Sequence, residues 1–141
     1  STIVYAENTE EPVYESVEEY LTENYSGTER EAITYLSIDG TVKSYTGLET
    51  LTNLTDLSLY NNTTDLSGIN LKELPKLKYV SFSQCKLNGT LDFTGNKNLT
   101  NIDISLYGDL SNAVVNIKGM NWLTDFSYEY PDSSTGFELK K

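Results

Sequence analysis

One stretch decides the fold: Leu54-Thr55-Asp56-Leu57-Ser58-Leu59-Tyr60-Asn61-Asn62. Its apolar residues stand at the first, fourth and sixth positions, and an asparagine stands at the ninth. Four further copies carry the same apolar spacing: Ile33, Leu36 and Ile38; Leu77, Val80 and Phe82; Leu99, Ile102 and Ile104; and Leu123, Phe126 and Tyr128. The first positions of the five copies are separated by 21, 23, 22 and 24 residues. Five copies in one register indicate a repeated structural unit.

A period of about 20 to 29 residues with this motif is typical of a leucine-rich repeat, in which each copy forms a short strand and a turn. A single copy has no second surface against which to bury its apolar positions, so the copies stack. We therefore predict a leucine-rich repeat solenoid that is mostly β. A short parallel concave sheet, irregular convex arcs and a helical N-terminal cap complete the predicted fold.

The chain of 141 residues has the length of one domain. Within it we expect a flexible acidic leader over residues 1–11, a helical cap over 12–32, five repeats over 33–130 and a C-terminal tail or cap over 131–141. The cap prediction rests on apolar residues at helical spacing, Val13, Val17, Tyr20 and Leu21, after a proline suited to the first helical turn, Pro12. An acidic helix that binds a partner is the functional alternative.

Charge and composition exclude several functions. Twenty-one acidic and ten basic residues give a net charge of -11, which opposes binding to nucleic acid or to an anionic membrane surface. No apolar run reaches the ~18 residues that a membrane span needs. Because the chain has one cysteine and no histidine, a disulfide framework and the common imidazole-based catalytic and metal sites are impossible. We predict no enzyme activity and no cofactor.

Residues between the apolar positions of each strand should face outward on the concave sheet. The third-position row is Tyr35, Asp56, Tyr79, Asn101 and Asp125. The fifth-position row is Ser37, Ser58, Ser81, Asp103 and Ser127. The rows beyond them are Asp39, Tyr60, Ser83, Ser105 and Glu129, and then Gly40, Asn61, Gln84, Leu106 and Tyr130. The predicted partner-binding residues are Tyr35, Asp56, Tyr60, Tyr79, Asn101, Asp103 and Asp125.

The ninth position should hold a buried residue in the turn that leaves the strand. Asn62 and Cys85 fit this position, whereas Tyr107 and Pro131 depart from it, so the last two repeats should be the least regular. We expect Cys85 to be a buried structural thiol, with a reactive thiol as the alternative. Trp122 should pack between the last two repeats, with an exposed ligand contact as the alternative.

Residues 47–59, followed by Asn62 and by Thr64-Asp65-Leu66, resemble the bacterial internalin-type leucine-rich repeat. The resemblance covers about residues 12–130 and weakens from Leu91 onward. It implies a secreted or surface-attached protein of a Gram-positive-like cell that binds host or surface proteins through its concave face.

Two further patterns have a structural and a functional interpretation. Asparagines in N-x-S/T sequons suggest glycosylation, but the repeat spacer Leu-Thr-Asn-Leu-Thr itself creates such sequons. They are Asn24, Asn53, Asn61, Asn62, Asn88 and Asn98. The carboxylates of Asp56, Asp103 and Asp125 could bind calcium or act as an acid/base pair, but exposed carboxylates usually only solvate a solenoid.

The leading hypothesis is a monomeric recognition module that binds a protein, or a glycan, through the concave face. A structural spacer within a larger surface protein, without its own ligand, is the second hypothesis. A carboxylate-dependent glycan-active protein is the third.

Overall fold

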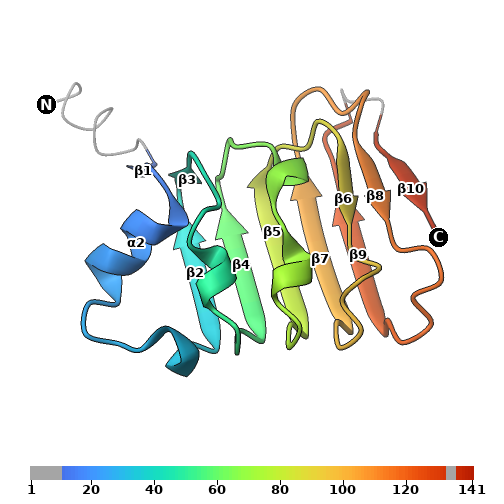
Figure 1. The fold of residues 1–141 in the computed structure, drawn as a ribbon. Coiled ribbons are helices and arrows are strands. Elements are labelled where there is room, and N and C mark those ends of the chain that lie inside the picture. Colours follow the sequence, from blue (N-terminus) through green and yellow to red (C-terminus); the bar gives the residue numbers. More distant parts are fainter. Residues whose placement is uncertain (1–10, 133–135) are drawn as a thin grey trace, which may run out of the picture.

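A computed structural model describes residues 11–132 and 136–141. Within them the chain forms a mostly-β parallel solenoid, which confirms the predicted solenoid architecture (Figure 1). The main sheet has five parallel strands in the order β2-β4-β5-β7-β9. These strands span Tyr35–Asp39 (β2), Asp56–Tyr60 (β4), Tyr79–Cys85 (β5), Asn101–Leu106 (β7) and Asp125–Glu129 (β9). Apart from Glu11, the predicted acidic leader lies outside the described residues.

The strand register stacks the apolar positions of successive turns. Leu36 pairs with Leu57, Leu57 with Val80, and Val80 with Ile102, and all four side chains are buried. A second buried row consists of Ile38, Leu59, Phe82 and Ile104. Residues two positions apart on a strand point to the same face. Both rows therefore enter one interior shared by the stacked turns.

The predicted convex arcs contain only short elements of secondary structure in the described residues. The early arcs hold short 3-10 helices: η2 (Leu48–Thr50), η3 (Leu66–Gly68) and η4 (Leu71–Glu73). The later arcs hold three short strands: β6 (Thr90–Asp92), β8 (Val114–Asn116) and β10 (Glu138–Lys140). These strands pair in parallel in the order β10-β8-β6, so the last turns have a second sheet (Figure 1). Leu91, Val115 and Leu139 align in its register, which gives the arcs a shared apolar row.

The N-terminal helix begins later than predicted. Helix α2 spans Val17–Asn24, and a 3-10 turn, η1, spans Arg30–Ala32. Ser16 caps α2 by accepting a hydrogen bond from the Glu19 N–H at 3.0 Å. The residues before it form strand β1 (Val13–Tyr14), which pairs with β3 (Thr41–Val42), and Val13 is 59% exposed. Backbone pairing therefore replaces the first helical turn predicted from Pro12. Val17 and Leu21 of the predicted apolar face are buried, and Tyr20 is partly buried against the core.

The last turn is also less buried than predicted. Tyr128, assigned by the sequence to the interior, is 49% exposed, and Leu123 and Phe126 are only partly buried. The reason is that β9 is the edge strand of the main sheet, so no further turn covers it within the described residues. Tyr128 instead contacts Phe126, Tyr130 and Phe137 in an aromatic cluster.

The fourth turn departs from the predicted ninth-position alignment. The register shifts between Phe82 and Cys85, and Cys85 pairs with Leu106, not with Tyr107. Asn61 and Gln84 adopt positive φ angles of 57° and 54° before the buried ninth residues of their turns. Two residues separate Phe82 from Cys85 on β5, whereas one residue separates Ile104 from Leu106 on β7. Leu106 is therefore buried and does not join the outward row predicted for it.

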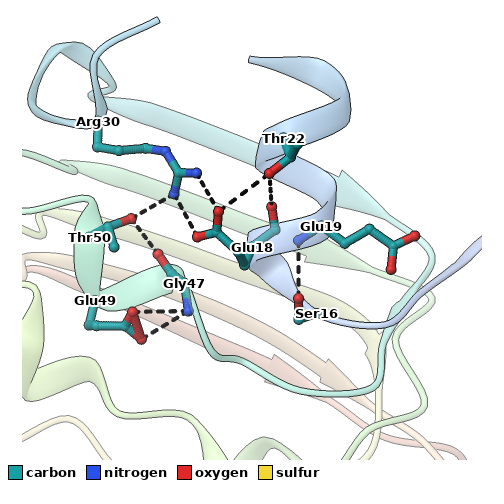
Figure 2. Close-up of polar contacts among 8 residues, drawn as sticks. All are labelled: Ser16, Glu18, Glu19, Thr22, Arg30, Gly47, Glu49 and Thr50. Atoms are coloured by element: carbon teal, nitrogen blue, oxygen red, sulfur yellow. Dashed lines mark hydrogen bonds and ion pairs between the residues drawn. The ribbon is translucent and has the colours of Figure 1, made fainter. Parts of the chain in front are cut away.

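An ionic network fixes α2 to the first turns (Figure 2). The Arg30 guanidinium donates from Nη1 and Nη2 to both carboxylate oxygens of Glu18, at 3.0 and 2.7 Å. Arg30 Nη1 also donates to Thr50 Oγ1 at 2.9 Å, and that hydroxyl donates to the Gly47 carbonyl at 2.6 Å. The network therefore links α2, η1 and η2, which are separate segments of the chain.

The core predicts a large effect of truncation at Leu57, whose side chain is fully buried. Leu57→Ala should lower the free energy of unfolding by about 2–5 kcal/mol, because it leaves a cavity between stacked turns. Thr52→Ala, at an exposed loop position, is the control and should change stability by less than about 0.5 kcal/mol. Denaturant melts measure both values. A loss below about 0.5 kcal/mol for Leu57→Ala would contradict the packing of this row.

The Arg30–Glu18 network predicts a pH-dependent contribution to stability. The hydrogen bond from Arg30 lowers the pKa of Glu18 below its ordinary value of 4.5. A lowered folded-state pKa stabilises the fold above the unfolded pKa, and this contribution is lost as the pH falls through the folded-state pKa. Glu18→Gln should therefore lower Tm at pH 7, and the difference from wild type should shrink at acidic pH. Glu23→Gln, at an exposed position on α2, is the control; an equal difference at all pH values for Glu18→Gln would refute the assignment.

Candidate functional site

The outward side of the main sheet brings the predicted binding residues together. The strand register joins Tyr35, Asp56, Tyr79, Asn101 and Asp125 in one row across the sheet. A middle row joins Ser37, Ser58, Ser81, Asp103 and Ser127. Asp39, Tyr60 and Ser83 form the start of a third row, which Ser105 and Glu129 continue on β7 and β9. We call the surface made by these three rows the open sheet face.

The first row combines tyrosines with polar side chains. Tyr35 is 56% exposed, and Tyr79 is partly exposed. Asp56 accepts a hydrogen bond from Thr55 Oγ1 at 2.7 Å. Asn101 Nδ2 donates to Asp125 Oδ2 at 3.0 Å, which orients these two side chains on adjacent strands. The row therefore presents acceptor oxygens and aromatic rings side by side.

The middle row is almost fully shielded from solvent in the centre of the sheet. Ser58 is 3% exposed and Ser81 is 7% exposed, although both are on the outward side of their strands. Within the described residues neither hydroxyl has a hydrogen-bond partner. Asp103 continues the row and is exposed, and it accepts a hydrogen bond from Ser127 Oγ at 2.9 Å. The row thus changes from small, shielded hydroxyls to an accessible carboxylate.

The Asp39 end of the third row is close to the paired strands β1 and β3. Asn61 Nδ2 donates to Asp39 Oδ1 at 2.9 Å. Burial raises the pKa of Glu11, and the neighbouring Asp39 carboxylate raises it further. Tyr60 is partly exposed at the end of β4. Tyr60 is two positions from Ser58 on the same strand, so both side chains are on the same face of the sheet.

The open sheet face is acidic. Its three rows contain five carboxylates and no lysine or arginine: Asp39, Asp56, Asp103, Asp125 and Glu129. The two ion pairs among the described residues, Arg30–Glu18 and Lys43–Glu15, lie outside these rows. The described part of the chain also has no cluster of three or more carboxylate, thiol or imidazole groups suited to a metal ion.

Two hollows on either side of Asp103 are the feature that the sequence pattern did not predict. One has a volume of about 290 Å³ and is lined by Ser81, Phe82, Ser83, Asp103, Ser105, Ser127, Tyr128 and Glu129. The other has a volume of about 250 Å³ and is lined by Tyr79, Asn101, Ile102, Asp103, Asp125, Phe126 and Ser127. We call this pair the Asp103 hollows. The only sequence signal for them is that an aspartate replaces serine in the middle row.

Cys85 belongs to the buried turn and not to the open sheet face. Its side chain is fully buried, which confirms the predicted burial, and Sγ is 3.4 Å from the Ser83 carbonyl and 3.5 Å from the Leu59 carbonyl. Burial raises the pKa of the thiol to about 11. In the previous turn Asn62 has the corresponding role, accepting from the Val42 N–H at 3.2 Å and donating to the Tyr45 hydroxyl at 2.8 Å.

Trp122 packs between the last turns, as the structural interpretation predicts. It is partly buried against the core, and its Nε1–H donates to the Asn96 carbonyl at 3.1 Å. Lys97 Nζ lies 4.5 Å from the centre of the indole ring. These contacts join the Trp122 side chain to the preceding turn of the solenoid.

No protein-family model, curated protein or solved structure matches the chain. Among the described residues, none of the helices has the length and apolar character needed to cross a membrane.

The environment of Cys85 predicts slow chemical modification. Its thiol is buried and its pKa is about 11, so the thiolate that reacts with a disulfide reagent is scarce and inaccessible at pH 8. A thiol reagent such as dithionitrobenzoate should react slowly with the native protein and rapidly after unfolding in denaturant. Glutathione, whose thiol is free in solution, calibrates the fast rate. Equally fast reaction of the native protein would contradict a buried structural role.

Proposed function

We propose that this protein is a recognition module that binds a protein ligand, or a glycan, through the open sheet face. The observation that carries the proposal is the placement of Tyr35, Tyr60 and Tyr79 on the outward side of three consecutive strands. Packing of the core does not require an aromatic ring there, because the interior is filled from the opposite side of each strand. Tyrosine supplies large contact area at low conformational cost, and it is enriched where proteins bind one another.

The proposal includes a family and a location. The repeat motif and the spacer at residues 47–59 support an internalin-type leucine-rich repeat, with α2 as its N-terminal cap. The buried Val17 and Leu21 support the capping role, since they cover the interior beside the first turn. A protein of this type would act as a monomer that is secreted or attached to a bacterial surface. The predicted partners are host or surface proteins, reached from outside the cell.

Substitution of the three tyrosines tests the binding face. The variant Tyr35→Ala/Tyr60→Ala/Tyr79→Ala should abolish binding to a partner obtained from a surface-protein screen, because it removes the aromatic contact area. Its melting temperature should stay within a few degrees of wild type, since these side chains lie outside the core. Tyr107→Ala is the control, because this tyrosine follows the end of β7, belongs to none of the three rows, and has its ring beside Lys86 Nζ. Undiminished binding by the triple variant would reject this face as the binding site.

A structural spacer is the second candidate, and one observation favours it. Tyr128 and Tyr130 are 49% and 41% exposed at the edge formed by β9, and they contact Phe137. In a spacer, a neighbouring unit would cover such an apolar edge. A surface-protein screen separates the two functions. Capture of a partner whose binding requires the open sheet face supports recognition, whereas the absence of any partner supports the spacer role.

A further inference from the structure

The residues that line the Asp103 hollows indicate the chemical class of a ligand. We propose that they receive an arginine side chain from an extended, basic segment of a protein partner. This inference rests on the proposed function and specifies the partner class at the same face.

The first argument is the charge of the open sheet face. Asp103 lines both hollows, while Asp125 lines one and Glu129 lines the other. Neither hollow is lined by a lysine or an arginine, and the three rows of the face contain no cationic residue. With a net charge of -11 for the whole chain, approach of a basic segment is favoured and approach of an acidic one is opposed.

The second argument is independent of charge. Ser81 lines the larger hollow and is 7% exposed to solvent. Its hydroxyl has no hydrogen-bond partner among the described residues. Ser58, in the adjacent position of the same row, is likewise shielded and without a partner. Each hydroxyl oxygen has no partner in the described part of the chain and can therefore accept a hydrogen bond from a ligand donor. Ser58, Ser81 and Asp103 lie on three adjacent strands, so the two hydroxyls are in line with the carboxylate.

The third argument is the fit of a guanidinium group. The described residues hold no carboxylate cluster suited to a metal ion, so a compact cation lacks a set of convergent ligands there. An arginine side chain is longer and planar, and it carries five donors that can reach carboxylate and hydroxyl oxygens in different directions. Tyr79 and Tyr128 line the two hollows and offer aromatic faces on which a guanidinium can stack.

The middle row also limits the shape of the partner. Because Ser58 and Ser81 are less than one-tenth exposed, a bulky element such as a helix cannot reach their hydroxyls. Parallel strands lie about 4.8 Å apart, and the row crosses five of them, which gives a track about 19 Å long. An extended segment of several residues fits this track, with its arginine at the Asp103 end.

The test uses a short, extended glycine/serine peptide with arginines at alternate positions and a fluorescein label. The matched peptide carries citrulline, which keeps the shape of arginine but lacks its charge. Fluorescence anisotropy at about 0.1 M salt should detect the arginine peptide, and the citrulline peptide should bind at least about tenfold more weakly. Raising the salt to about 1 M should weaken binding of the arginine peptide, because exposed carboxylates contribute to it.

Two variants locate the site. Asp103→Asn should weaken binding of the arginine peptide about tenfold, because it removes the charge while an amide oxygen can still accept from Ser127. Glu129→Gln, at the other side of the larger hollow, should weaken it less, and it provides a second test if Asp103→Asn melts at a markedly lower temperature. Glu23→Gln on α2 removes one exposed charge elsewhere and should leave the affinity unchanged.

The outcomes separate this inference from the proposed function. Equal binding of the arginine and citrulline peptides, or undiminished binding by both Asp103→Asn and Glu129→Gln, would overturn the arginine site. Partner binding that requires Tyr35, Tyr60 and Tyr79 would then still support recognition through the open sheet face. Conversely, arginine-selective binding that depends on Asp103 would stand even if the tyrosine variant retained its protein partner.

Discussion

Parallel pairing of equivalent strand positions is the constraint on which the rest of the structure depends. Each turn is too small to enclose its own apolar residues, so Leu57 is buried only because Leu36 and Val80 lie beside it on the neighbouring strands. The same pairing fixes the outward side chains, since one register sets both faces of a strand. The core and the open sheet face are therefore two results of a single alignment.

This dependence on neighbours explains why the two ends of the solenoid differ. At the β2 end, Val17 and Leu21 of α2 are buried in the core, and Arg30 links the helix to η2 through Glu18 and Thr50. At the β9 end, Tyr128 occupies a core position of the repeat but is half exposed. The identity of a repeat position therefore does not determine burial at an edge; the presence of a neighbouring turn does.

The sequence was informative where local periodicity and stacking act together, and less so where backbone pairing competes. Alternation within the strands was sufficient to assign the parallel solenoid and to align Tyr35, Asp56 and Tyr79 in one row. Leu106 was misplaced because apolar spacing does not record the absence of one residue from a turn. The helix start predicted from Pro12 was wrong because the Pro12 carbonyl accepts a hydrogen bond from the Thr41 N–H at 2.9 Å. No local sequence pattern encodes this long-range bond.

The depth of the candidate site could not be read from the sequence for a related reason. A row of serines is compatible with a flat, hydrated surface, but in the structure Ser58 and Ser81 are almost fully shielded from solvent. Asp56 and Tyr60 stand on either side of Ser58 along β4, and Tyr79 and Ser83 stand on either side of Ser81 along β5. Where the row reaches Asp103, the next strand is the edge strand β9, and the shielding decreases. The exposed carboxylate of Asp103 therefore lies at the accessible end of the middle row. A charged group of a ligand can stay hydrated there until it pairs with the carboxylate, which avoids the cost of burying an unpaired charge.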